Sequence, residues 1–129
     1  MTKTDFIVKI HLVISAIVVF SVALLYGFYP NMIFKINPDT IDELNLLKAI
    51  MGVYIGFSLL WLVGMCNKNY LKAAIISNII FMIGLAFGRF LSIITDGLPG
   101  TVYVFGTFAE LFLGVYGIWV LNYLNKKNG

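Results

Sequence analysis

The sequence predicts an all-α integral membrane protein: a compact bundle of four transmembrane helices in antiparallel, up-and-down order. Of its 129 residues, 60% are hydrophobic and only 12% are charged, whereas soluble domains are about half apolar and about a quarter charged. The mean hydropathy is +0.95. The apolar residues form four runs, each close to the roughly 20 residues that a helix needs to cross a bilayer. The length favours a single domain over residues 1–129.

The four spans are expected to follow one another with short polar segments between them. The first lies at about residues 6–29, where the run LVISAIVVFSVALLYGFY contains no charge. This run is longer than the apolar core of a cleaved signal peptide, so we expect the first span to be retained. The remaining spans are expected at about residues 46–66, 71–94 and 102–124.

The segments YPNMIFKINPDTIDELN, NKNYLK and TDGLPG connect the spans. They are rich in Pro, Gly, Asn and Asp, which is typical of loops. Within the first segment, residues 38–45 predict a short separate helix at the membrane surface, with Asn37 or Asp39 near its N-terminus.

Lysines are distributed unequally between the two ends of the predicted bundle. If the four helices alternate in direction, one end carries Lys3, Lys9, Lys68, Lys72, Lys126 and Lys127. The other end carries Lys35 and Lys48 together with the acidic residues Asp39, Asp42, Glu43 and Asp96. Because cytoplasmic loops are enriched in Lys and Arg, we expect both termini to be cytoplasmic.

Glycines recur at the spacing of membrane-helix contacts. Two G-x-x-x-G motifs and a third glycine face occur in the last three spans: Gly52 with Gly56, Gly84 with Gly88, and Gly106 with Gly114 and Gly117. Such glycines let helix backbones approach closely, so we expect packing within one protomer. The alternative is a homo-oligomer interface formed by the same faces.

One arginine and one glutamate lie inside the predicted spans. Arg89 lies about 9 Å before the outer end of the third span and Glu110 about 12 Å after the outer start of the fourth, at about 1.5 Å per residue. The two charges are therefore expected at the same depth on antiparallel neighbours, with Tyr103 on the same face as Glu110. A lone charge near the bilayer centre costs at least about 2.5–3.5 kcal/mol, so we predict that they form an ion pair.

Other polar residues extend this pair into a candidate cluster. Arg89, Ser92 and Asp96 fall along one stripe of the third helix, and Lys48 at the outer start of the second helix can snorkel or join them. Tyr26 is expected at the same outer level. The candidate ligand-binding residues are Lys48, Arg89, Ser92, Asp96 and Glu110.

The sequence carries no other recognisable chemistry. Cys66 and His11 are the sole residues of their types, which excludes an intramolecular disulfide and a Cys/His metal cluster. No nucleotide-binding loop or catalytic-triad order occurs, so no cofactor is predicted, and the scattered lysines form no basic stripe for nucleic acid. We expect His11 near the cytoplasmic headgroups, and Trp61, Trp119 and Tyr123 in the aromatic belt.

Four blocks of this sequence resemble a known family. They are YGFYP at 26–30, LKAIMGVYIGFSLLWLVGM at 47–65, FMIGLAFGRFLSIITDGLP at 81–99 and AELFLGVYGIW at 109–119. Together they resemble domain-of-unknown-function family 4345, small bacterial membrane proteins with four predicted spans. The most specific part is G-R-x-x-S-x-x-x-D-G-x-P followed by an intramembrane Glu, here Gly88, Arg89, Ser92, Asp96, Gly97, Pro99 and Glu110.

This resemblance implies four helices and one polar constellation, and it implies no activity. Where the family usually has an arginine before the A-x-x-G block of the second span, this sequence has Lys48. Lysine is a point charge and lacks the planar, bidentate geometry of arginine.

Three functions are consistent with these residues. The first is binding of a small ligand or lipid headgroup in an outward-facing pocket, with Lys48 and Arg89 supplying positive charge. The second is a membrane enzyme for a lipid-soluble substrate, with Glu110 or Asp96 as the proton donor or acceptor. The third is a structural or accessory subunit that docks through its glycine faces. A cavity lined by Arg89 and Glu110 would favour the first two, and a closed ion pair would favour the third. No enzyme class is indicated, so a non-enzymatic function is preferred.

Overall fold

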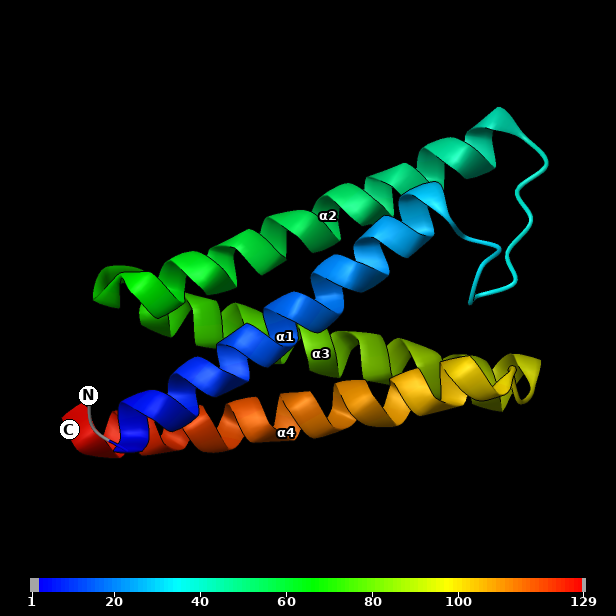
Figure 1. Cartoon of the computed structure of the whole chain (residues 1–129). Coiled ribbons are helices and arrows are strands. Elements are labelled where there is room, and N and C mark those ends of the chain that lie inside the picture. The colour runs from blue at the N-terminus through cyan, green and yellow to red at the C-terminus, as the bar shows by residue number, and fades with distance from the viewer. Residues whose placement is uncertain (1–2, 129) are drawn as a thin grey trace.

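The computed structural model describes residues 3–128, and these form four long helices (Figure 1). The helices are α1 (Lys3–Phe28), α2 (Ile41–Cys66), α3 (Lys68–Asp96) and α4 (Thr101–Asn128). Each is long and apolar enough to cross a membrane, and no strand occurs among the residues described. The predicted all-α, four-helix membrane architecture is therefore confirmed.

The bundle consists of two antiparallel helical hairpins that meet at one end and splay at the other (Figure 1). The most extensive contacts join α1 to α2, α3 to α4 and α2 to α3, whereas α1 touches α4 over a small area. That area lies near the ends of the chain, where the Tyr116 hydroxyl donates to the Ile7 carbonyl oxygen at 3.1 Å. Toward residue 28, α1 diverges from α4 and leaves the opposite end of the bundle open.

A capping box fixes the start of α2. The Thr40 hydroxyl oxygen accepts a hydrogen bond from the Glu43 backbone N–H at 3.2 Å, and the Glu43 carboxylate accepts one from the Thr40 N–H at 3.4 Å. This reciprocal pairing satisfies two of the free donors at the N-terminus of a helix that then runs unbroken to Cys66. The short surface helix predicted at residues 38–45 is therefore correct only from Ile41 onward, and it is continuous with α2 instead of separate.

A single residue, Asn67, separates α2 from α3. Its backbone N–H donates to the Val63 carbonyl oxygen at 2.8 Å, and its side-chain oxygen accepts from the Asn69 N–H at 3.0 Å. Asn67 thus ends one helix and caps the next, and most of the loop expected at residues 67–72 is helical. The corner brings Gly64 into direct contact with Ala74, because a Cβ on Gly64 would overlap the Ala74 methyl group.

The other close approaches at glycine lie on α1, where a Cβ on Gly27 would overlap the Met51 side chain of α2, and on α4. A Cβ on Gly114 would meet Ile83 and Met82 of α3, and one on Gly117 would meet Ile79 and the His11 ring. Both G-x-x-x-G motifs instead lie on exposed helix faces, where an added Cβ would meet nothing within 4 Å; their glycines are Gly52, Gly56, Gly84 and Gly88. The expectation that these motifs pack within the protomer is wrong.

His11 and Trp61 are fully buried, which corrects their expected places at the membrane interface. His11 Nε2 lies 3.1 Å from the Leu113 carbonyl oxygen. A carbonyl oxygen can only accept, so Nε2 carries the proton and donates. The ring turns inward because Gly117 has no side chain and leaves room for it against α4. Trp61 packs its ring on Phe81 and donates Nε1–H to the Ser77 hydroxyl at 3.2 Å.

Candidate functional site

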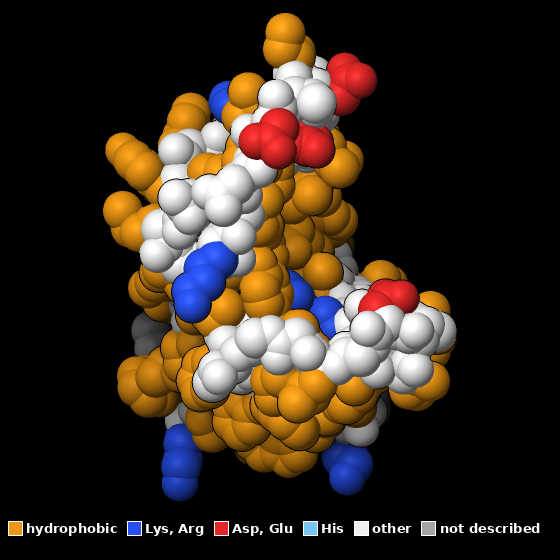
Figure 2. All heavy atoms as spheres, turned by 90° about the vertical axis from the view of Figure 1, so that its right-hand side faces the viewer, with side chains coloured by type: hydrophobic (Ala, Val, Ile, Leu, Met, Phe, Trp, Pro, Cys, Tyr) orange, Lys and Arg blue, Asp and Glu red, His pale blue; other side chains and the backbone are white. Residues whose placement is uncertain are grey.

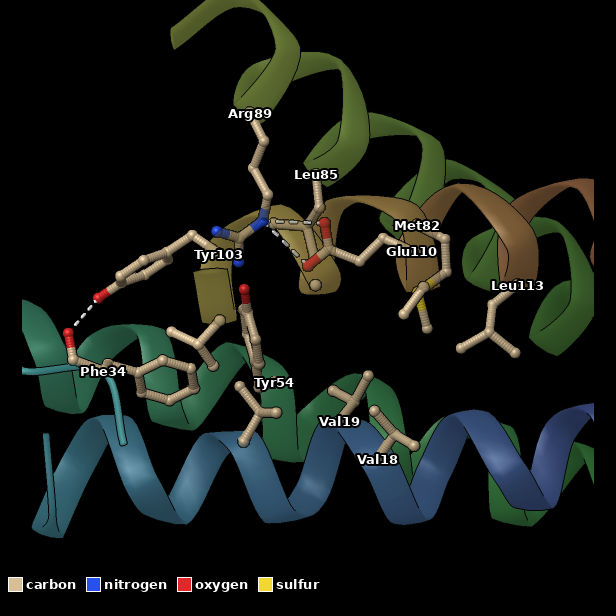
Figure 3. A pocket seen from close by; sticks show the side chains of 14 residues that line it. Val18, Val19, Phe34, Tyr54, Met82, Leu85, Arg89, Tyr103, Glu110 and Leu113 are labelled. Carbon is tan, nitrogen blue, oxygen red and sulfur yellow. Dashed lines mark hydrogen bonds and ion pairs between the residues drawn. The ribbon is translucent and has the colours of Figure 1, made fainter. Parts of the chain in front are cut away.

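A cavity of about 90 Å³ lies where the two hairpins diverge (Figure 3). Its walls are mostly apolar. Helix α4 contributes the most lining residues, including Ala109 and Leu113, and α1 and α3 contribute three each, with Val18 and Val22 among those on α1. Val18 also forms part of the outer surface of α1, where it is 43% exposed. The cavity therefore opens sideways between α1 and α4, onto the surface that a membrane would cover.

The splayed end of the bundle exposes a recess between the two hairpins. Figure 2, which looks onto this end, shows hydrophobic walls with basic side-chain atoms at the bottom of the recess. Acidic side chains appear on the rims at either side. The interior of this end is thus largely apolar, with its charge concentrated at one place.

Arg89 and Glu110 form an ion pair on one wall of the cavity. Arg89 Nε donates to both carboxylate oxygens of Glu110, at 2.9 and 3.1 Å. The two side chains are 23% and 15% exposed, so the pair is partly withdrawn from its surroundings. The predicted contact between α3 and α4 is confirmed. Because both carboxylate oxygens face one guanidinium group, each charge is compensated locally.

Tyrosines from three helices surround the guanidinium group: Tyr26 on α1, Tyr54 on α2 and Tyr103 on α4. Arg89 Nη2 donates to the Tyr26 hydroxyl at a long 3.4 Å, and Arg89 Cζ lies 5.9 Å from the centre of the Tyr103 ring. The second distance is within the range of a cation–π contact. The Tyr54 hydroxyl points into the cavity (Figure 3), and no hydrogen-bond partner for it occurs among residues 3–128.

Phe34 closes the cavity on the side of the loop between α1 and α2. Its ring stacks on Tyr26 with centroids 4.5 Å apart, and its carbonyl oxygen accepts a 2.6 Å hydrogen bond from the Tyr103 hydroxyl. The next residue, Lys35, has φ 54°, a left-handed conformation that is uncommon outside glycine. This turn allows Phe34 to point inward while Lys35 stays exposed. The loop is thus fastened to α4 across the open end.

The other candidate residues lie apart from the ion pair. The Ser92 hydroxyl donates to Asp96 at 2.9 Å, and both side chains are exposed. Asp96 shares the stripe of Arg89 but lies about 10 Å farther along α3, since seven residues separate them at about 1.5 Å each. Lys48 is exposed on α2, with Nζ 5.8 Å from the centre of the Phe28 ring. The structure therefore brings together Arg89 and Glu110 but neither Lys48, Ser92 nor Asp96.

Only some of the residues that complete the site could be predicted from the sequence. The sequence placed Tyr26 at the right level and Tyr103 on the face of Glu110, whereas it gave no sign of Phe34 or Tyr54. Tyr54 shares its buried helix face with Leu47, Ser58 and Trp61. Their spacing of three, four and seven residues is the signal that could have identified it.

A family model described as "Domain of unknown function (DUF4345)" matches residues 7–121. No curated protein and no solved structure matches the chain. The matched range includes every residue that lines the cavity.

Proposed function

Since the chain belongs to the DUF4345 family, whose function is unknown, we propose its function from its own structure: a multi-pass membrane protein that binds a lipid-soluble small molecule in the cavity between α1 and α4. The observation that carries the proposal is a mostly apolar cavity that reaches the exposed Val18 on the side of α1, which we take as its opening to the membrane, with Arg89 and Glu110 as its charged lining residues. Small-molecule sites typically combine apolar walls with a few placed polar groups.

The size and walls of the cavity support an apolar occupant. A water molecule needs about 10–15 Å³ of such space, and apolar cavities of about 150 Å³ stay dry and bind small hydrocarbons. At about 90 Å³ the cavity can take a short hydrocarbon segment or a small ring, while the rest of a longer molecule stays in the opening. A ligand that already resides in the bilayer reaches this opening without crossing water.

Binding is favoured over catalysis by the closed ion pair. Both oxygens of Glu110 accept hydrogen bonds from Arg89, which leaves this carboxylate poorly placed to give or take a proton from a substrate. Asp96, the other candidate acid, is exposed and bonded to Ser92 outside the cavity.

Filling the cavity is expected to abolish binding. Gly106 lines the cavity, and a Cβ at this position would meet nothing within 4 Å, so Gly106→Leu places its side chain in open space. Wild-type protein in liposomes should be labelled saturably by a long-chain hydrocarbon carrying a photoreactive diazirine. Mass spectrometry should locate the label near Val18 and Ala109, and Gly106→Leu should lower this labelling at least about tenfold.

Gly84→Leu is the matched control, because Gly84 is also a helical glycine with nothing within 4 Å of an added Cβ, but it does not line the cavity. It should label like the wild-type protein. Equal labelling of Gly106→Leu, or wild-type labelling that never saturates, would mean that the probe reacts from bulk lipid and would contradict the proposal.

We also propose that the protein lies in a bacterial inner membrane, as the family resemblance implies, with both termini cytoplasmic, as the lysine distribution predicts. Cysteines introduced at Asp42 and Gly97, in a background where Cys66 is replaced by serine, should react with a membrane-impermeant thiol reagent added outside. Cysteines at Lys68 and Lys127 should react only after the membrane is opened. External labelling at either of these two positions would reverse or refute this topology.

A further inference from the structure

The polar edge of the cavity indicates which class of molecule it takes. On the basis of the proposed function, we infer that the ligand is an uncharged, lipid-soluble carbonyl compound. Its oxygen accepts hydrogen bonds from Tyr54 and Arg89.

The charge balance disfavours an ionised ligand. Among the residues that line the cavity, the ionised side chains are Arg89 and Glu110, and these compensate each other at 2.9 Å. A carboxylate or phosphate that accepted hydrogen bonds from the free N–H groups of Arg89 would bring a second negative charge beside Glu110, and one guanidinium group cannot compensate both. A cation would have to compete with Arg89 for Glu110. Uncompensated charges in apolar surroundings are costly, so the cavity selects neutral molecules.

The donor balance favours an oxygen that accepts hydrogen bonds. A guanidinium group carries five N–H donors, and Arg89 uses its Nε–H on Glu110 and one Nη2–H on Tyr26. The remaining N–H groups have no acceptor within residues 3–128. The Tyr54 hydroxyl, which points into the same cavity, is also unused. The cavity edge therefore offers several donors, while the carboxylate acceptors are already engaged.

The positions of these groups orient the ligand. Arg89 and Glu110 occupy one side of the cavity, and Val18 and Val19 of α1 lie on the other (Figure 3). The Tyr54 side chain comes from the side of the valines and directs its hydroxyl toward Arg89 (Figure 3). A carbonyl group would point toward Arg89 and Tyr54. Its apolar body would lie against Val18, Val22 and Leu113 and leave through the gap between α1 and α4.

Three diazirine photoprobes of equal chain length test this inference on the full chain in liposomes: a methyl ketone, the corresponding carboxylic acid and the corresponding hydrocarbon. The ketone should reach half-maximal labelling at about a tenfold lower concentration than either of the others. Tyr54→Phe removes one hydrogen bond and should weaken ketone labelling about two- to tenfold. It should leave hydrocarbon labelling unchanged, which also shows that the variant is folded.

Tyr116→Phe is the matched control, since its hydroxyl donates to the Ile7 carbonyl oxygen at the other end of the bundle. It should not alter the preference for the ketone. Labelling by the acid equal to or stronger than that by the ketone would overturn the inference, as would a Tyr54→Phe variant with wild-type ketone labelling. If instead no probe labels saturably and Gly106→Leu changes nothing, the proposed function itself fails.

Discussion

Replacement of Arg89 by leucine is expected to destabilise the folded protein by about 3–5 kcal/mol, because Glu110 then remains in the bundle without its partner. Glu110→Leu should cost a similar amount for the reciprocal reason. The double replacement should recover much of this loss, since no uncompensated charge remains. The measurement is the unfolding midpoint of purified protein in detergent, together with the fraction that elutes as a single folded species.

Asp96→Leu provides the control on the same helix, because this carboxylate is exposed and lies away from the cavity. It should change the midpoint little. Single variants as stable as the wild-type protein, or a double variant no better than the worse single one, would show that the pair does not stabilise the bundle. The double variant also lacks the free donors of Arg89, so it should fold yet lose the preference for the ketone probe.

The second large effect is expected at Gly64. A Cβ at this position would overlap the Cβ of Ala74 and lie 3.1 Å from the Tyr70 backbone carbonyl oxygen. Neither atom belongs to a flexible side chain, so α2 and α3 must move apart. Overpacking of this kind typically costs about 1–3 kcal/mol, and Gly64→Ala should lower stability by that amount.

Gly52→Ala on the same helix is the matched comparison, because its Cβ would meet nothing within 4 Å. It should be as stable as the wild-type protein in the same unfolding experiment. If the two alanine variants were equally stable, the close contact at the α2–α3 corner would not contribute to stability.

The lengths of the membrane spans and the depths of residues along them could be predicted from the sequence. Each observed helix contains its predicted span apart from Tyr29, which follows the last residue of α1, because hydropathy marks how far a chain can lie in lipid. The depth of a residue follows from its distance along a helix, and this arithmetic was enough to match Arg89 with Glu110. The residues at which helices begin and end could be predicted less accurately, because they depend on local hydrogen bonds at Thr40 and Asn67.

The face that each helix turns toward the interior of the bundle could not be predicted equally well. In a soluble protein the buried face is apolar and the outer face is polar, but lipid is as apolar as a protein interior. The hydropathy pattern therefore did not show that the His11 and Trp61 side chains turn inward. The same ambiguity explains the G-x-x-x-G motifs, whose spacing defines a face without saying what that face meets.

The aromatic part of the site depends on contacts across the bundle. Phe34 lies in a loop and reaches the cavity through one left-handed residue and one hydrogen bond to Tyr103, 69 positions along the chain. Tyr54 reaches it because α2 packs behind α1 and α3. Neither relation has a short-range pattern, so only the folded arrangement reveals them.

The placement of the ion pair within one hairpin also bears on biosynthesis. Translation delivers Arg89 21 residues before Glu110, which at about 5–20 residues per second is a delay of about one to four seconds. During that interval the Arg89 side chain on α3 has no carboxylate to pair with. Lateral release of α3 alone into lipid is therefore unfavourable. We therefore expect the insertion machinery to retain α3 until α4 has been synthesised and to release the two helices into the membrane together. The contact of His11 with Leu113, 102 residues apart, can form only after that step.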